Sequence, residues 1–247
     1  MTALLFATPS GVEVPAVTVA QMREVDRIAV EETGPNLYQM MENAGRSLAL
    51  TVVDLLGAAW PSTPILVLAG TGGNGGGGIC AARHLANRGA EVTVVVADPE
   101  RLAPVPAAQL RTYRHTTGRS ATVDDLDGGI EAGLVVDAVV GYSLSGPPRG
   151  AVAAMIDWAG AGPAPVVSLD VPFGIDPDTG LAAGGGVHIT AHRTLTLALP
   201  KIGLDSPAVG DLWLADIGIP AGVLRRAGIE MPPGVFGAGE VVRLHAG

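Results

Sequence analysis

The sequence predicts an α/β fold, with a mostly parallel, doubly wound sheet and helices on both of its faces. Short apolar segments typical of buried strands alternate with helical segments along most of the chain. A glycine-rich segment also follows the first of these strands, where open α/β sheets bind small molecules. With 247 residues, 48% of them hydrophobic, the chain is long enough for one sizeable core. We therefore expect a single domain over residues 1–247.

Two helices are predicted before the first strand. Thr18 is a candidate N-cap, and apolar residues recur at helical spacing from Met22 to Ala29. Gly34-Pro35 is expected to end this helix. A second amphipathic helix is predicted from Leu37 to Leu56.

The remaining elements alternate between strand and helix. The predicted strands, short and rich in apolar or β-branched residues, are Ile65–Ala69, Glu91–Ala97, Leu134–Val140, Pro165–Leu169 and Arg193–Ala198. The predicted helices between them are Ile79–Arg88, Pro106–Thr116 and Ala151–Ala159. Residues 221–247, which contain several Pro and Gly, are expected to form an irregular C-terminal tail.

Composition limits the classes of function. A formal charge of −9 and scattered arginines argue against a nucleic-acid-binding surface. The single cysteine, Cys80, excludes an internal disulfide and suits a reducing compartment. The N-terminus lacks the pattern of an export signal, and no apolar run approaches the ~18 residues of a membrane span. We expect a cytoplasmic protein that binds neither nucleic acid nor membrane.

The glycine-rich segment is the first candidate site. Residues 70–78 hold seven glycines and Asn74, between a predicted strand and a predicted helix. Such a loop leaves backbone N–H groups free to bind an anion and removes side chains that would block a ligand. The alternative interpretation is a flexible loop or a tight packing turn. The predicted substrate contacts here are Gly72, Gly73, Asn74, Gly75, Gly76 and Gly77.

Three charged residues at or near later strand ends are further candidates. Asp137 lies inside an apolar strand, where a carboxylate must be paired, metal-bound or hydrogen-bonded to backbone N–H groups. Asp170 ends a strand just before a turn, so its carboxylate should either face the crevice or cap that turn. Lys201, the only lysine, either holds a phosphate or is an ordinary solvated side chain.

Six groups of residues, in order, resemble one known family. They are Met22–Asp26; Met40–Gly45; Gly70–Gly78 with Ala81–Leu85; Val136–Gly141; Leu169–Pro172; and Thr194–Lys201 with Asp216–Pro220. On these motifs, which span about residues 18–220, the chain is identified as a divergent member of the NAD(P)H-hydrate epimerase family, the YjeF-related N-terminal domain.

The resemblance implies a fold, an activity and a ligand. The fold would be a Rossmann-like three-layer α/β/α sandwich, in an assembly that can be a homodimer. The activity would be nicotinamide nucleotide repair, an isomerase reaction between the R and S epimers of hydrated NADH or NADPH. This phosphorylated nucleotide would be the substrate rather than a cofactor, and a bound potassium ion is expected beside it.

The resemblance also assigns roles to individual residues. Asp170 would be the catalytic carboxylate, and Asn74 and Asp137 would be potassium ligands. Residues 141–147 would hold the phosphates. Beyond the glycine-rich segment, the expected substrate-binding residues are Gly141, Tyr142, Ser143, Leu144, Ser145, Gly146, Phe173 and Lys201.

The chain departs from the family pattern at four site positions. In the phosphate loop, Ser143 stands where a Gly is common. Gly73 replaces an Asn, and Gly77 replaces an Asp. Phe173 replaces a potassium-binding Ser and offers no side-chain oxygen, which counts against the ion, although its ring could stack on an aromatic ligand.

Two alternative functions remain at this point. One is a divergent relative that acts on another small molecule in specialised metabolism, or only binds a ligand. The other is an NAD-dependent dehydrogenase, since Gly70–Gly75 satisfies G-x-G-x-x-G and Asp98 ends the next strand, near the position of a ribose-binding acid.

Overall fold

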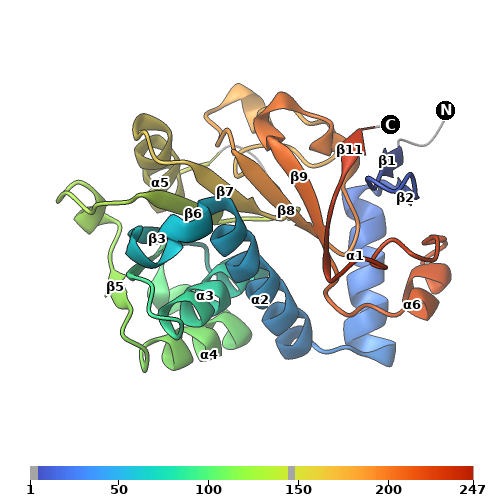
Figure 1. Cartoon of the computed structure of the whole chain (residues 1–247), viewed down its shortest axis with the longest axis horizontal. Coiled ribbons are helices and arrows are strands. Elements are labelled where there is room, and N and C mark those ends of the chain that lie inside the picture. The colour runs from blue at the N-terminus through green and yellow to red at the C-terminus, as the bar shows by residue number, and fades with distance from the viewer. Residues whose placement is uncertain (1–4, 144–147, 247) are drawn as a thin grey trace.

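A computed structural model describes residues 5–143 and 148–246, and its centre is an eight-stranded sheet (Figure 1). The strands, in spatial order, are β10 (Val241–Arg243), β9 (Asp211–Ala215), β8 (Arg193–Leu197), β7 (Val166–Leu169), β6 (Leu134–Ala138), β3 (Ile65–Ala69), β4 (Val92–Val96) and β5 (Arg119–Ala121). All neighbours pair in parallel except β9 and β10. The predicted doubly wound sheet and its five predicted strands are confirmed, and β5, β9 and β10 are additional.

Helices cover both faces of this sheet, as a three-layer α/β/α sandwich requires. They are α1 (Val19–Ile28), α2 (Leu37–Leu56), α3 (Gly73–Ala86), α4 (Pro104–Tyr113), α5 (Ala151–Ala161) and α6 (Ala221–Arg226). Shorter turns of helix are η1 (Ala29–Thr33), η2 (Gly57–Ser62), η3 (Pro99–Arg101), η4 (Asp124–Leu126), η5 (Ala183–Gly185), η6 (Ile202–Leu204) and η7 (Pro207–Val209).

Local sequence explains where α1 and α2 begin. The Thr18 side chain accepts a hydrogen bond from the Gln21 N–H, and the Gln21 side chain accepts one from the Thr18 N–H. Asn36 and Gln39 form the same reciprocal pair at the start of α2. Each capping box satisfies N–H groups that have no partner inside the helix, so the predicted N-cap at Thr18 is confirmed.

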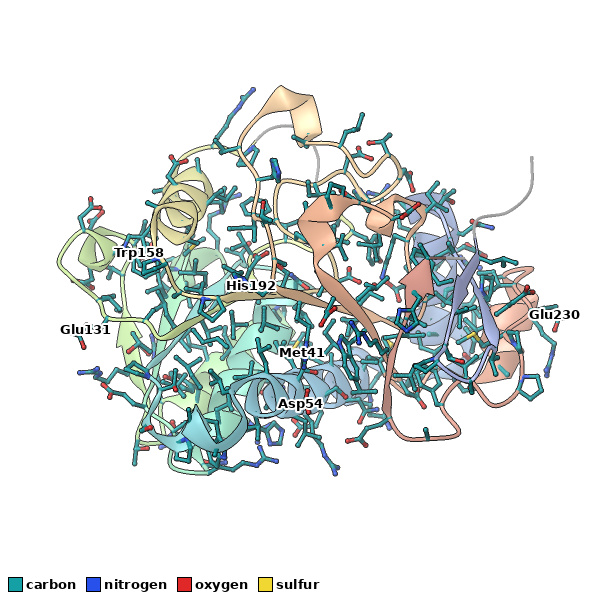
Figure 2. The ribbon with its side chains drawn as sticks, turned by 45° about the horizontal axis from the view of Figure 1, so that its top comes forward. Met41, Asp54, Glu131, Trp158, His192 and Glu230 are labelled. Atoms are coloured by element: carbon teal, nitrogen blue, oxygen red, sulfur yellow. The ribbon has the colours of Figure 1, made fainter. Side chains whose placement is uncertain are left out.

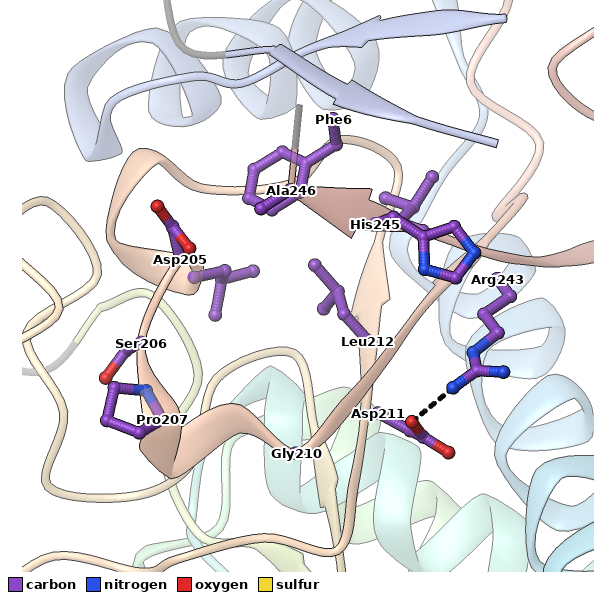
Figure 3. Close-up of a pocket in the computed structure, with 12 residues that line it drawn as sticks. Phe6, Asp205, Ser206, Pro207, Gly210, Asp211, Leu212, Arg243, His245 and Ala246 are labelled. Atoms are coloured by element: carbon purple, nitrogen blue, oxygen red, sulfur yellow. Dashed lines mark hydrogen bonds and ion pairs between the residues drawn. The ribbon is translucent and has the colours of Figure 1, made fainter. Parts of the chain in front are cut away.

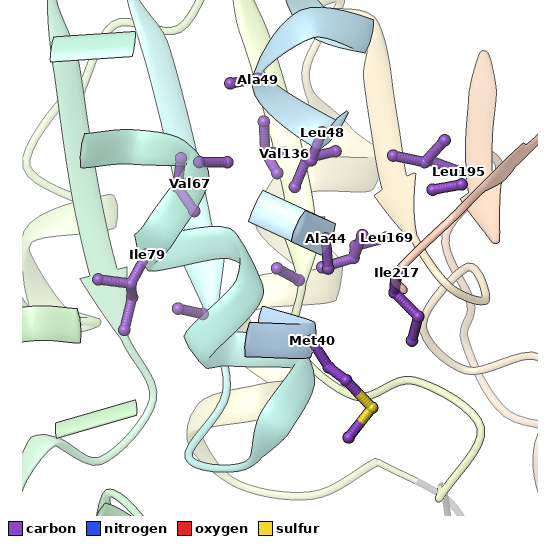
Figure 4. Close-up of a cluster of buried hydrophobic side chains, with 14 of the residues drawn as sticks. Met40, Ala44, Leu48, Ala49, Val67, Ile79, Val136, Leu169, Leu195 and Ile217 are labelled. Carbon is purple, nitrogen blue, oxygen red and sulfur yellow. The ribbon is translucent and has the colours of Figure 1, made fainter. Parts of the chain in front are cut away.

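The strand β3 shows how the two faces are packed. Ile65, Val67 and Ala69 belong to the core cluster under α1, α2, α3 and α4, which Figure 4 shows around α2 and α3. Leu66 and Leu68 point the other way, into the cluster under α5. This alternation places each successive side chain on the opposite face, and both faces are buried because helices cover both.

Polar side chains connect the helices to the rest of the molecule. On α2, which also carries Met41, Asp54 pairs with Arg193 of β8 at 2.6 Å, and Trp158 lies on α5 (Figure 2). The Trp158 indole N–H donates to the Leu126 carbonyl at 3.0 Å, which ties α5 to the segment before β6. None of the helices formed by residues 5–143 and 148–246 has the length and apolar character needed to cross a membrane.

The glycine-rich segment is helical over most of its length, which corrects the predicted loop over residues 70–78. Helix α3 begins at Gly73, six residues earlier than predicted. A Cβ on Gly75 would lie 1.9 Å from the Gly70 carbonyl oxygen, and one on Gly78 would lie 2.4 Å from the Ala138 Cβ. These glycines therefore let the first turns of α3 approach the strand ends closely. This is a packing role, as in the alternative interpretation of the segment given above.

The C-terminal segment is only partly irregular, which corrects the predicted irregular tail over residues 221–247. The described residues 221–246 contain α6, β10 and β11 (His245–Ala246). β11 pairs with β1 (Leu5–Ala7), and β1 pairs with β2 (Glu13–Pro15), in a small antiparallel sheet that brings the two ends of the chain together (Figure 1). Val242 and Leu244 are buried there with Phe6, and this apolar burial holds the segment in place.

Candidate active site

The carboxyl ends of β3, β6, β7 and β8 meet around one cavity of about 290 Å³. The strand order reverses between β3 and β6, and such a switch point is where open α/β sheets bind ligands. The apolar part of the lining includes Met22, Leu37, Met40 and Met41. The polar side chains that line it are Asp26, Asn74, Tyr142, Ser143, Asp170 and Lys201.

Asp170 is the most constrained side chain of this cavity. Its residue is 3% exposed and has a φ of 69°, a left-handed conformation that aspartate tolerates better than most residues. Its Oδ2 accepts the Tyr142 N–H at 3.0 Å. Its Oδ1 accepts the Lys201 ammonium, together with longer contacts of 3.4 Å from the Thr196 hydroxyl and the Leu197 N–H. All these partners are donors, which suits an ionised carboxylate.

Lys201 is the buried partner of Asp170 rather than a solvated side chain. It is 1% exposed, and its ammonium also donates to the Thr196 hydroxyl at 3.3 Å and the Leu197 carbonyl at 3.1 Å. The same ammonium lies 5.6 Å from the centre of the Tyr142 ring. These protein contacts use the three donors of the amine. The geometry therefore favours a role in holding Asp170, and the predicted substrate contact stays a prediction.

Asp26 is a cavity residue to which sequence reasoning assigned no role. It lies on α1, and its carboxylate accepts a hydrogen bond from the Tyr142 hydroxyl. Burial raises the pKa of Asp26, although the Tyr142 hydrogen bond opposes this. The available signal was the spacing, since Asp26 follows the buried Met22 by four residues and so lies on the same face of the helix.

Gly141 is required by the close approach of two polar side chains. A Cβ at this position would lie 2.6 Å from Asp170 Oδ2 and 3.2 Å from Asn74 Oδ1. Asn74 lies in the first turn of α3, where the N-cap residue Gly72 has no side chain to bind the exposed N–H groups. These N–H groups carry the partial positive charge of a helix N-terminus, which favours an anionic ligand.

The two predicted potassium ligands have different surroundings. Asp137 is buried beside the neighbouring strand, where its Oδ2 accepts the Ser168 hydroxyl and the Phe173 N–H, both at 2.8 Å, and its Oδ1 accepts the Val139 N–H at 3.3 Å. Burial raises the pKa of Asp137 to about 6. Asp137 is not among the residues that line the cavity with Asn74, and its hydrogen bonds account for a buried carboxylate without an ion, so the potassium site stays a prediction.

The prediction also assigned Phe173 to the substrate site, whereas its side chain lies in the core. Its side chain is 1% exposed and packs with Leu66, Leu68 and Met155 in the core under α5. It neither lines the cavity nor offers an oxygen to a cation, so its assignment as a substrate-binding residue is wrong. The transfer of a phenyl ring from water into this core favours the buried position.

The predicted site residues thus separate into three groups. Those on the cavity are Gly73, Asn74, Gly77, Gly141, Tyr142, Ser143, Asp170 and Lys201. Five others do not line it. Asp137 and Phe173 are buried as described above, Gly75 and Gly76 face the Gly70 carbonyl and Met41, and Gly72 is exposed at the helix start. Leu144, Ser145 and Gly146 lie outside the described residues.

Two other features of the described residues have the form of a site. A hollow of about 380 Å³ lies between the small sheet and β9, but it contains none of the predicted residues, and Asp211 and Arg243 pair with each other there at 2.6 Å (Figure 3). Glu42, Cys80 and His84 lie close enough together to hold a metal ion. However, the Arg83 guanidinium already donates to Glu42 at 2.6 Å and to Cys80 at 3.3 Å, so this side chain supplies the positive charge that a metal ion would bring.

Comparison with known proteins gives consistent matches. Residues 37–203 match the family described as YjeF-related protein N-terminus. An NAD(P)H-hydrate epimerase of Dehalogenimonas lykanthroporepellens is 49% identical over 99% of this chain and 98% of its own length. A bifunctional NAD(P)H-hydrate repair enzyme of Salinibacter ruber is 35% identical over 86% of this chain, which spans 42% of that longer protein.

A solved structure has the same fold. The crystal structure of yeast ynu0 superposes with a TM-score of 0.77, at 23% identity, over 93% of this chain and 100% of that one. The likeness extends over nearly the whole molecule, so the sheet order and the helical layers described above are those of a known fold.

Proposed function

Because the chain belongs to the family of YjeF-related protein N-terminal domains, we propose that it interconverts the R and S epimers of hydrated NADH or NADPH. The observation that carries the proposal is the match to an epimerase over nearly the full length of both chains. The cavity supports it, since an ion-paired carboxylate, an uncapped helix start and an apolar wall meet there. Such a site suits a ligand with both phosphates and a ring.

The reaction requires two proton transfers: one to the hydroxyl group as it leaves, and one from the water molecule as it returns. The hydroxyl-bearing carbon of the hydrate is bonded to the ring nitrogen, whose lone pair can expel the hydroxyl group and leave a planar iminium. Water that returns to the opposite face gives the other epimer. Asp170 donates a proton when the hydroxyl group leaves and accepts one when water returns. A positioned acid/base residue contributes roughly 10²–10⁴-fold to such a rate.

The alternative functions receive less support from the structure. The altered position Phe173 lies in the core, so its side chain does not reshape the cavity for another ligand. The altered positions that line the cavity are Gly73, Gly77 and Ser143. Asp98, the ribose-binding candidate of a dehydrogenase, accepts the Glu100 N–H at 3.2 Å as the N-cap of η3. A homodimer and a cytoplasmic location stay predictions.

The direct test is an epimerisation assay. Purified R epimer of hydrated NADH is incubated with the protein, and the two epimers are separated by HPLC over time. We expect equilibration well above the rate without protein. Equilibration at the spontaneous rate, or oxidation of NADH with a carbonyl substrate instead, would contradict the proposed function.

A further inference from the structure

We propose that Asp26 is a second acid/base residue, which transfers the proton on one face of the substrate ring while Asp170 transfers it on the other. This inference rests on the proposed function, because it divides the proton transfers of that reaction between two carboxyl groups. Both groups line the same cavity, one from α1 and the other from the end of β7.

The two carboxyl groups are bound to opposite ends of one residue. The Tyr142 N–H donates to Asp170 at 3.0 Å, and the Tyr142 hydroxyl donates to Asp26. Tyr142 therefore bridges the two carboxyl groups, one through its backbone N–H and the other through its hydroxyl. In inverting glycosidases, carboxyl groups about 6.5–9.5 Å apart leave room for a water molecule on the face opposite the leaving group. The same arrangement suits a ring carbon that loses its hydroxyl group on one face and gains water on the other.

The surroundings of the two groups favour different protonation states. Asp170 accepts a hydrogen bond from the buried ammonium of Lys201, and its other partners are also donors. Asp26 has the Tyr142 hydroxyl as its hydrogen-bonding partner among the described residues, and burial raises the pKa of Asp26. The charged groups that influence it are Lys201 and Asp170. When two carboxyl groups in one site have different environments, one can serve as the acid and the other as the base.

Proton balance is maintained by the pair. For the epimer whose hydroxyl group faces Asp26, protonated Asp26 gives its proton to that group. The carbon–oxygen bond then breaks and a water molecule departs, so that an iminium and an Asp26 carboxylate remain. A water molecule on the other face then forms the new carbon–oxygen bond and gives a proton to the Asp170 carboxylate. The reverse reaction uses protonated Asp170 and the Asp26 carboxylate. Proton exchange with solvent restores the starting state.

The matched control lies on the same helix. Glu24 is exposed, bonds to Arg27 at 2.8 Å and does not line the cavity. Glu24→Gln therefore removes a carboxylate from α1 without changing the cavity. Asp26→Asn keeps the size of the side chain and an oxygen that can accept the Tyr142 hydroxyl, but it cannot hold a transferable proton. Tyr142→Phe, which removes the hydroxyl donor while leaving the Asp26 carboxyl group, provides a second variant if Asp26→Asn does not fold.

The experiment follows epimerisation and oxygen exchange together. Each purified epimer of hydrated NADH is incubated with each variant in ¹⁸O-labelled water, and mass spectrometry reports ¹⁸O incorporation in the separated epimers. We expect Asp26→Asn to lose roughly 10²–10⁴-fold in epimerisation rate while it still exchanges the oxygen of the epimer served by Asp170. Asp170→Asn is expected to retain exchange of the opposite epimer. Tyr142→Phe should slow epimerisation less than Asp26→Asn, and Glu24→Gln should match the wild type.

The outcomes separate the two proposals. If the wild type does not epimerise the substrate, the proposed function fails. If the wild type is active but folded Asp26→Asn epimerises at the wild-type rate, or retains no exchange of either epimer, the second acid/base residue is excluded. An Asp26→Asn protein that does not fold, combined with a Tyr142→Phe protein of unchanged rate, also contradicts the inference.

Discussion

The Asp170 carboxylate is fixed by donors that come from the ends of two other strands. Tyr142 follows β6, while Thr196, Leu197 and Lys201 belong to β8 and the segment after it. This network holds a non-glycine residue in a left-handed conformation, a form of local strain that is often found at functional sites. The carboxylate is thus oriented before any ligand enters.

Lys201→Met tests the buried ion pair. Removal of the ammonium leaves the Asp170 charge buried without its partner, so we expect a loss of about 3–5 kcal/mol in the free energy of unfolding, measured by urea denaturation. In the double variant Asp170→Asn with Lys201→Met no buried charge remains, so it should lose less than the sum of the two single changes. An unchanged unfolding midpoint in Lys201→Met would show that the pair contributes nothing.

Potassium is expected to have no effect on the rate. Asp137 already accepts hydrogen bonds from Ser168, Phe173 and Val139, and the Phe173 side chain has no oxygen for a cation. Epimerisation should therefore proceed equally in potassium buffer and in tetramethylammonium buffer of the same ionic strength. A rate that rises with potassium and saturates would show that an ion binds after all.

At the residue scale, the sequence located Asp170 but not its partner. The sequence shows that this carboxylate ends a strand and precedes a turn, and such a position faces the edge of a parallel sheet where ligands bind. Lys201 is 31 residues away from it, and their contact depends on how the segment after β8 returns to the sheet. Phe173 was misplaced for a similar reason, because the face of a turn to which a side chain points is set by tertiary packing.

At the element scale, the start of α3 shows why glycine can be helical here. A helix start so close to the strand ends excludes a Cβ at Gly75 and Gly78, and the resulting contacts offset the low helix propensity of glycine. Sequence reasoning ended the loop after Gly78 because it relied on that propensity. The existence and order of the helices were predictable from periodicity, whereas this boundary depended on contacts between elements.

Gly78→Ala and Gly73→Ala form a matched pair within the same helix. A Cβ on Gly78 would lie 2.4 Å from the Ala138 Cβ, while a Cβ on Gly73 meets nothing within 4 Å. We expect Gly78→Ala to lower the free energy of unfolding by about 1–3 kcal/mol through overpacking. Gly73→Ala should leave it unchanged or raise it by up to about 1 kcal/mol. Equal unfolding midpoints for the two variants in urea would contradict the packing account of the glycine-rich segment.

At the scale of the whole molecule, described segments from near the two ends of the chain, β1 and β11, pair in one sheet. The small sheet β11-β1-β2 closes over a cluster that includes Phe6 and Leu244, and β10 extends the main sheet at the edge. These strands were not predictable from the sequence, because each has only two or three residues and so no measurable periodicity. The central sheet was predictable because its longer strands are continuous apolar runs.

Leu244→Ala tests whether the C-terminal segment belongs to the folded unit. Leu244 is 3% exposed, so its truncation should cost about 2–5 kcal/mol in the free energy of unfolding. Leu181→Ala is the control, since Leu181 is 69% exposed and its truncation should change stability by no more than about 0.5 kcal/mol. If urea unfolding gives the same midpoint for both variants, the segment does not stabilise the domain.

The architecture brings the ends of β3, β6, β7 and β8 together, and the function depends on Asp170 at the centre of this edge. The most direct test compares wild-type protein with Asp170→Asn in the exchange of hydrated NADH epimers, with ligand binding measured in parallel. The variant should bind the ligand nearly as well as the wild type and epimerise it roughly 10²–10⁴-fold more slowly. An Asp170→Asn protein that binds and epimerises as the wild type does would contradict this account of the site.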